Sequence, residues 1–227
     1  FAWANSRDPD SLERAEMVLR LMEDMYDAGN DDVRPSTRSF NIVLLAAASG
    51  AKQDASIRAQ LFFDRMKESD YIVPDAISYN TLIEAYAKNG GDDTLDSISN
   101  LVEEAYNAEG VLLNSIFFSG VISSLSRFGL RGAVAAAEKI VQEIKSKHDD
   151  GKLSMTVDTN IYNALINSWA KSAEIDAPIR AEEILTLMES EATNGNNMLK
   201  PNVQTYTSVA DCWAKSKDPN AAYRAEA

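Results

Sequence analysis

Five small polar side chains, each directly after an aromatic residue, are the groups in this sequence best suited to specific hydrogen bonding. They are Asn41, Asn80, Ser119, Asn163 and Thr207, and they follow Phe40, Tyr79, Phe118, Tyr162 and Tyr206. Amide and hydroxyl groups both donate and accept hydrogen bonds, so they can recognise the polar edge of a ligand. The same residue types are also favoured at the solvated start of a helix, and both interpretations fit the pattern.

The residues that catalysis and metal binding usually need are scarce. The chain of 227 residues has one histidine, His148, and one cysteine, Cys212, which leaves little for a Ser-His-Asp triad, a metal cage or a disulfide. Paired acidic residues such as Asp31 and Asp32 lack the spacing of a calcium loop. No Gly-rich phosphate loop or nucleophile motif occurs. The sequence therefore predicts a protein that is not an enzyme and that holds no metal or cofactor.

The composition is that of a globular chain with an acidic balance. Apolar residues make up 45% and charged residues 25%. The 22 basic and 35 acidic residues give a net charge of 22 − 35 = −13. No apolar run reaches the roughly 18 residues of a membrane span, so we expect no membrane partner.

The aromatic residues mark an internal repeat. They are 39, 39, 44 and 44 residues apart. Seven residues after each aromatic lie Ala47, Tyr86, Leu125, Trp169 and Trp213, and twelve residues further on lie Ala59, Ile98, Ala137, Ala181 and Ala225. Trp3 and Ala15 fit the same register. A constant distance of 12 residues in six copies indicates a repeated structural unit, with the length differences taken up in the connections.

Each unit is predicted to be a pair of helices. The first helix has apolar residues at helical spacing, as in Tyr79, Leu82 and Tyr86, and ends near glycine, as at Asn89-Gly90-Gly91. The second helix has the same kind of stripe, as from Ile179 to Met188.

Prolines mark the boundaries of these helices. Asp8-Pro9 and Asp218-Pro219 are expected to open second helices, whereas Pro35, Pro74 and Pro201 precede first helices. No segment alternates with period two, so no strand is predicted. Helix pairs that cannot bury their apolar stripes alone can stack, which predicts an all-α fold of the α-solenoid class.

We expect one continuous array with defined repeat boundaries. The expected segments are a partial repeat at 1–36, four repeats at 37–75, 76–114, 115–158 and 159–202, and a partial repeat at 203–227. Both ends cut through a repeat and lack the polar caps that a solenoid needs. The sequence is therefore expected to be a fragment of a longer array.

Several segments resemble the pentatricopeptide repeat family. The resemblance rests on the stretch from Val73 to Gly90, on Asp158 to Ile166, and on Lys200 to Tyr206, and in register it covers essentially the whole chain. It implies stacked helix-turn-helix repeats in a right-handed superhelix. These repeats, at 39 or 44 residues, are longer than the roughly 35 usual in the family, and solenoid loops tolerate such insertions.

The resemblance also implies binding of single-stranded RNA, with two residues of each repeat reading one base by hydrogen bonds to its Watson–Crick edge. The pairs implied are Asn41 with Asp75, Asn80 with Asn114, Ser119 with Asp158, and Asn163 with Asn202, while Thr207 begins a fifth pair. The code of the family would read them, from 5′ to 3′, as U, C (or U), G, and C (or U).

Two further sets of residues follow from this resemblance. In the family, the residue two positions before each aromatic stacks on the base, which implies Arg38, Ile77, Ile116, Asn160 and Gln204. Nine residues after the aromatics come basic residues placed for phosphate contact, namely Lys88, Arg127, Lys171 and Lys215. These four could instead complement the C-termini of helices.

The resemblance favours a non-catalytic RNA-binding array that acts in RNA processing, stability or translation in a mitochondrion or chloroplast. Neither a small-molecule substrate nor a membrane is expected as a partner. The alternative is a scaffold for protein partners within a larger assembly. The acidic net charge favours this alternative, because it repels RNA at long range. The repeated polar pairs favour RNA.

Overall fold

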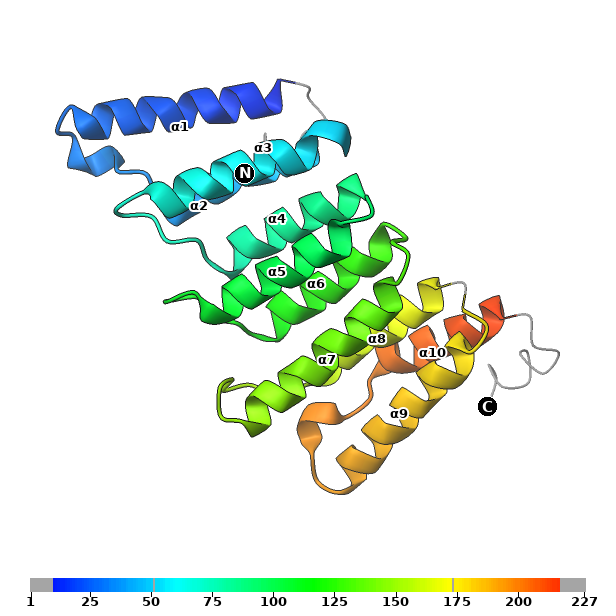
Figure 1. The fold of residues 1–227 in the computed structure, drawn as a ribbon. Coiled ribbons are helices and arrows are strands. Elements are labelled where there is room, and N and C mark those ends of the chain that lie inside the picture. The colour runs from blue at the N-terminus through cyan, green and yellow to red at the C-terminus, as the bar shows by residue number, and fades with distance from the viewer. Residues whose placement is uncertain (1–9, 51, 173, 217–227) are drawn as a thin grey trace. The chain divides into compact units, whose positions relative to one another are not determined.

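The computed structural model describes residues 10–50, 52–172 and 174–216, and every regular element within these ranges is a helix (Figure 1). The first helices of the repeats are α2 Thr37–Ser49, α4 Ala76–Asn89, α6 Ser115–Arg127, α8 Thr159–Lys171 and α10 Val203–Lys215. The second helices are α1 Ser11–Asp27, α3 Lys52–Glu68, α5 Thr94–Asn107, α7 Ala133–Asp149 and α9 Ala177–Thr193. Two short 3-10 helices, η1 Asp31–Val33 and η2 Asn197–Leu199, precede α2 and α10. The all-α prediction is confirmed.

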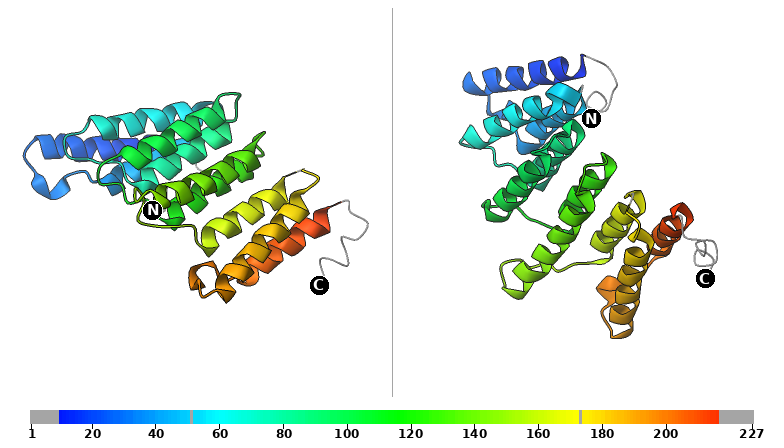
Figure 2. Two further views of the ribbon diagram at one scale, coloured as in Figure 1. Left: turned by 60° about the horizontal axis from the view of Figure 1, so that its bottom comes forward. Right: turned by 45° about the vertical axis from the view of Figure 1, so that its right-hand side comes forward.

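The helices form two compact units, Phe1–Leu113 and Asn114–Ala227. In unit 1, α2 packs against α1, α3 and α4, and α4 also packs against α3 and α5. In unit 2, α8 packs against α6, α7, α9 and α10. Each unit is thus a stack of helix-turn-helix repeats, which Figure 2 shows from two further directions. This is the predicted solenoid type of packing.

The aromatic residues that define the repeat lie in the core of each unit. Phe40, Tyr79, Phe118 and Tyr162 are buried, as are Trp169 and Trp213. Tyr79 packs edge-on against Phe63 of the preceding second helix, with ring centroids 4.9 Å apart. Burial and the nearby carboxylate of Glu104 raise the pKa of the Tyr79 hydroxyl, which donates a hydrogen bond to Glu104. At Tyr79, these contacts place the aromatic at the junction between two helix pairs of unit 1.

Tyr206 differs from the other aromatics because its side chain is 49% exposed. Its hydroxyl reaches Glu189 of α9 at 3.0 Å, but the second helix of its own repeat would fall in residues 217–227. That segment lies outside the described residues, as do Trp3, Ala225, Asp8-Pro9 and Asp218-Pro219. Cys212, in contrast, is buried in α10, and burial raises the pKa of its thiol to about 12.

The first helices begin in one common way. Each is preceded by an extended residue whose side chain accepts a hydrogen bond from the backbone N–H three residues further on. These N-caps are Ser36, Asp75, Asn114, Asp158 and Asn202. They satisfy a backbone donor that would otherwise lack a partner at the helix end. Pro35, Pro74 and Pro201 directly precede three of them, as the sequence predicts.

Glycine ends one of these helices as expected. After Asn89, the last residue of α4, Gly90 adopts a φ of 63° and donates its N–H to the carbonyl of Tyr86. Residues with a Cβ rarely adopt this left-handed backbone, which explains glycine at this position.

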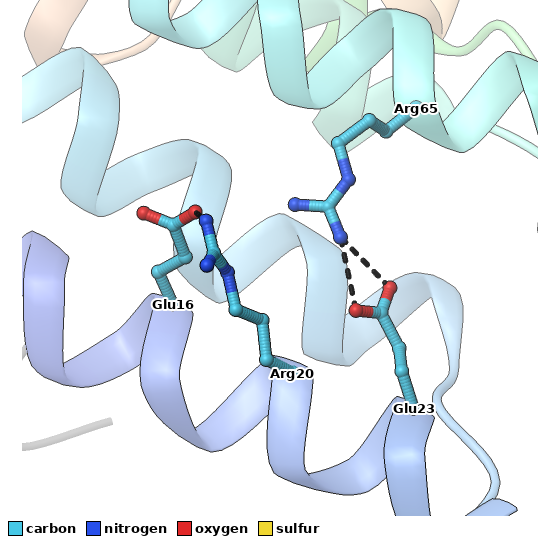
Figure 3. A network of polar contacts seen from close by, with 4 residues as sticks. All are labelled: Glu16, Arg20, Glu23 and Arg65. Atoms are coloured by element: carbon cyan, nitrogen blue, oxygen red, sulfur yellow. Dashed lines mark hydrogen bonds and ion pairs between the residues drawn. The ribbon is translucent and has the colours of Figure 1, made fainter. Parts of the chain in front are cut away.

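Ion pairs join neighbouring second helices within each unit. In unit 1, Nη2 of Arg65 on α3 lies 2.9 Å from both carboxylate oxygens of Glu23 on α1 (Figure 3). In unit 2, Nη2 of Arg180 on α9 lies 2.8 Å from Glu138 on α7. This contact is the main cause of the raised pKa of Arg180. By contrast, Arg20 pairs with Glu16 on its own helix, so it joins no second element.

None of the described helices combines the length and the apolar character that would allow it to cross a membrane.

Candidate functional site

The predicted base-reading residues occupy two fixed positions of the first helices. Asn41, Asn80, Ser119, Asn163 and Thr207 are each the fifth helical residue after an N-cap. Their predicted partners Asp75, Asn114, Asp158 and Asn202 are themselves the N-caps of the following first helices. The second member of every pair therefore also caps the N-terminus of the first helix of the next repeat.

In unit 1, the structure brings Asn41 and Asp75 into direct contact. Nδ2 of Asn41 donates to Oδ1 of Asp75 at 3.0 Å. Oγ of Ser78, the third residue of α4, donates to Oδ1 of Asn41 at 2.6 Å. Ser78 also accepts the backbone N–H of Asp75 at 3.0 Å. These three residues, the Asn41 cluster, thus form a closed ring of hydrogen bonds between two successive first helices.

In unit 2, the same arrangement recurs with other residues. Nδ2 of Asn163 donates to Oδ1 of Asn202 at 3.2 Å, and Oγ1 of Thr205 donates to Oδ1 of Asn163 at 2.7 Å. Thr205 in turn accepts the backbone N–H of Asn202 at 3.0 Å. We refer to Asn163, Asn202 and Thr205 as the Asn163 cluster. It differs from the Asn41 cluster in burial, because Asn163 is 1% exposed whereas Asn41 is half-buried.

The two clusters leave chemically different atoms for a ligand. Among the described residues, the hydrogen bonds that the side chain of Asp75 accepts end on Oδ1, and those that the side chain of Asn202 accepts also end on Oδ1. The second carboxylate oxygen of Asp75 can only accept a hydrogen bond, whereas the amide nitrogen of Asn202 can only donate one. The two pairs therefore have the same geometry, but one offers a ligand a hydrogen-bond acceptor and the other a donor.

Ser119 and Asp158 are not joined in this way. Oγ of Ser119 bonds to the carbonyl of Ile116 in its own helix at 3.2 Å. Oδ1 of Asp158 accepts Oγ of Ser115 at 2.7 Å and the N–H of Ile161 at 3.0 Å. Ile161 is the third residue of α8, so this repeat has no hydroxyl at the position of Ser78 and Thr205. We refer to Ser119 and Asp158 as the Ser119 pair.

For the other predicted base-reading residues, Asn80, Asn114 and Thr207, base reading stays a prediction from the sequence. Asn80 belongs to unit 1 and Asn114 to unit 2, so neither unit contains their pair. Thr207 is exposed and bonds to the carbonyl of Val203 in its own helix at 2.7 Å.

The predicted stacking residues share one position, the second residue of each first helix, and all are exposed. Ile77 and Ile116 are 63% and 75% exposed, as are several other large apolar side chains of the described residues. Arg38, Asn160 and Gln204 hold the same position in their helices. An apolar side chain kept in solvent beside a polar pair is available to cover the face of a base.

The four predicted phosphate contacts have different surroundings. Nζ of Lys88 donates to the carbonyls of Ala48, Ser49 and Gly50 at 3.2, 3.0 and 2.7 Å. This is the helix-capping role that the sequence left open, although the capped helix is α2 and not Lys88's own helix. Lys215 pairs with Asp211 at 2.5 Å. Lys171 is exposed on α8, and the guanidinium of Arg127 lies 6.0 Å from the ring centre of Phe128.

Ser78 and Thr205 are the site residues that sequence reasoning missed. Both are 0% exposed and both touch a predicted reader and its predicted partner. The signal was present, because a hydroxyl three residues after an Asp or Asn cap is typical of a capping box. Among the described residues, no group of three or more His, Cys, Asp or Glu side chains is placed to hold a metal ion.

The chain is similar to pentatricopeptide repeat proteins in both sequence and structure. A family model described as the pentatricopeptide repeat domain matches residues 20–89. Two pentatricopeptide repeat-containing proteins of Arabidopsis thaliana are each 29% identical, over 72% and 59% of this chain; the second is named as chloroplastic. The chain spans only 26% and 15% of the length of these relatives.

A solved structure is similar over 96% of this chain and 28% of its own length, with 22% identity and a TM-score of 0.54. It is the crystal structure of the pentatricopeptide repeat protein PPR10 in complex with an 18-nucleotide psaJ RNA element. A similarity at this level supports the fold assigned above.

Proposed function

We propose that this chain, which belongs to the pentatricopeptide repeat family, binds single-stranded RNA and reads its bases through the polar pairs of its first helices. The observation that carries the proposal is the Asn41 cluster and its recurrence in unit 2. Two helices of successive repeats present one amide and one cap side chain side by side, which is a pattern of donors and acceptors of the size of one base edge.

The open atoms of the two clusters match different pyrimidines. Uracil carries an N–H at N3, which can donate to the free carboxylate oxygen of Asp75, and a carbonyl at C4, which can accept the second N–H of Asn41. Cytosine has an unprotonated N3 that can accept from the amide of Asn202. This reasoning from the atoms agrees with the family code, which assigns U to Asn41 with Asp75 and C (or U) to Asn163 with Asn202.

The burial of Asn163 refines the proposal for unit 2. Because Asn163 is 1% exposed whereas Asn202 is exposed, a base reaches Asn202 first. Asn163 then acts by orienting Asn202 through the bond between them. In unit 1, half-buried Asn41 is itself within reach of the base.

The acidic net charge of −13 makes local charge decisive. Long-range repulsion slows the approach of RNA, so affinity must come from stacking and hydrogen bonds at the pairs and from basic side chains near them. We assign phosphate contact chiefly to Lys171, which is exposed. Lys88 would have to leave three carbonyl groups to make the same contact.

The names of the relatives support a proposal for the wider role. One of them is named as chloroplastic, which supports a role in an organelle. We propose a non-catalytic factor for RNA processing, stability or translation there. Since the relatives are several times longer than this chain, the pairs described here account for only part of the recognition by the whole protein.

The test is equilibrium binding of labelled single-stranded RNA carrying U-C-G-C, against RNA with the same bases in scrambled order, at two salt concentrations. We expect tighter binding of U-C-G-C by about tenfold or more, and weaker binding of both RNAs at higher salt. Absence of binding to either RNA at low salt, with circular dichroism showing folded protein, would overturn the proposal. A scaffold for protein partners would then be the better interpretation.

A further inference from the structure

We infer that Ser78 and Thr205 are specificity-determining residues, because their hydroxyl groups fix the amides of Asn41 and Asn163 and thereby the polar groups that Asn41 and Asn202 present to a base. This inference rests on the proposed function and adds a third residue to each reading pair. The residue is the third of the following first helix.

The hydroxyl of Ser78 fixes the orientation of the Asn41 amide. Ser78 has one proton to donate, and its shortest acceptor is Oδ1 of Asn41, at 2.6 Å against 3.0 Å for Asp75. The amide nitrogen of Asn41, Nδ2, donates to the carboxylate of Asp75. Rotating the amide by 180° would place its oxygen against that carboxylate and forfeit both bonds. The hydroxyl and the carboxylate together therefore select one amide orientation.

A fixed orientation matters because Asn alone is ambiguous. A free amide can turn either its N–H or its oxygen toward a base, so it can pair with a donor or with an acceptor. Once the ring of hydrogen bonds is closed, the remaining N–H of Asn41 and the free oxygen of Asp75 point from fixed positions. Such preorganisation lowers the entropy lost on binding the matching base and penalises the wrong one.

Helix capping alone does not account for these contacts. Ser39 is the third residue of α2 and forms the same kind of capping box, with Ser36. Its hydroxyl bonds to the hydroxyl of Ser36 at 3.1 Å. Ser78 and Thr205 form their capping boxes and, in addition, reach 37 and 42 residues back along the chain to Asn41 and Asn163. This extra bond occurs in both units with nearly the same length.

The chain contains a matched control for an experiment. Ser78→Ala removes the capping box and the bond to Asn41, whereas Ser39→Ala removes only a capping box. Ser78→Thr keeps the hydroxyl, as Thr205 does at the equivalent position. The full chain and its three variants are titrated with U-C-G-C and with C-C-G-C, which differ at the base assigned to the Asn41 cluster.

The readout is the ratio of the two dissociation constants. Ser78→Ala is expected to lower this ratio by about three- to tenfold, as the loss of one hydrogen bond implies. Ser78→Thr should restore it, and Ser39→Ala should leave it unchanged. A purely structural hydroxyl would change both dissociation constants equally and leave the ratio intact, and that result would overturn the inference.

Two further outcomes are decisive. If the unsubstituted chain binds no RNA, the proposed function falls and the inference with it. If it discriminates between the two RNAs and Ser78→Ala does so equally well, only the inference falls. Should Ser78→Ala fail to fold, Thr205→Ala and Thr205→Ser give the same comparison at the fourth base, with RNAs ending in C or in G.

Discussion

Asn41 in unit 1 and Ser119 in unit 2 occupy the same position of their helices, yet only Asn41 is bonded to the cap of the next first helix. Asn41 reaches Asp75 directly and is held by Ser78. Ser119 turns back to its own helix, and Asp158 bonds instead to Ser115. Two repeats with the same cap residue, Asp, therefore present different surfaces.

Two side chains explain this difference. A serine at the reading position is one group shorter than asparagine and has a carbonyl acceptor within its own turn. Ile161 replaces the hydroxyl that would close the ring from the following helix. On the proposed function, this comparison means that three positions assemble a reading pair, and that the third position supplies the hydroxyl that holds the amide.

Lys88 in unit 1 and Lys171 in unit 2 give a second comparison between the units. We expect the largest effect on stability at Lys88. Both lysines lie nine residues after the aromatic of their repeat, but only Lys88 is shown bonded to three carbonyl groups. Lys88→Met should lower the free energy of unfolding of unit 1 by about 1–2 kcal/mol, because the last carbonyls of α2 lose a charged donor. Urea unfolding measures the loss, and hydrogen exchange of the α2 amides locates it.

Lys171→Met is the matched variant in unit 2. It should leave stability unchanged, lower RNA affinity for all sequences alike, and reduce the slope of affinity against salt by about one. Equal destabilisation by both variants would contradict a stabilising role for the three carbonyl contacts of Lys88.

The Ser119 pair can be moved toward the Asn41 cluster. Ser119→Asn should shift the preference at the third base from G toward U, the base that the family code assigns to Asn with Asp. The shift should be only about threefold, since Ile161 supplies no hydroxyl to hold the new amide. Adding Ile161→Thr should make this shift larger, because threonine supplies the hydroxyl. Competition binding with RNAs that differ at this base measures the shift in both variants. If Ser119→Asn alone shifted the preference as much as the double variant does, a role for the hydroxyl at the third helical position would be contradicted.

The smallest effect on stability is expected at the ion pairs between second helices. Arg65→Gln in unit 1 and Arg180→Gln in unit 2 should each lower the free energy of unfolding by about 1 kcal/mol, because each pair joins two helices and is partly shielded from water. Arg20→Gln, which breaks an exposed pair within α1, should cost less than about 0.5 kcal/mol. Thermal unfolding of the three variants checks the order, and an equal loss in Arg20→Gln would contradict it.

The sequence predicts the local features of this fold well. Apolar periodicity and cap residues depend on neighbours within a few positions, which is why they predict helices well; the first helices begin at Thr37, Ala76, Ser115, Thr159 and Val203. The buried aromatics follow from the same pattern. Tyr206 is exposed, and the second helix that the sequence predicts for its repeat would fall in residues outside the described ranges.

The candidate site could be predicted only in part, since its hydrogen bonds join residues 34 to 42 positions apart. The sequence singled out Asn41 and Asp75 but not Ser78, whose capping signal looks purely local. It also gave no means to tell Lys88 from Lys171, because the acceptor carbonyls of Lys88 belong to the preceding repeat. Packing between repeats decides such contacts.

The most direct test of base reading by the polar pairs is a crossed exchange, in which Asp75→Asn and Asn202→Asp are combined in one chain. Both helix caps are retained, because Asp and Asn cap equally well, and the net charge stays the same. Measured against U-C-G-C and C-C-G-U RNAs, the unsubstituted chain should prefer the first and the exchanged chain the second, each by about tenfold. If both chains rank the two RNAs in the same order, the pairs do not read bases.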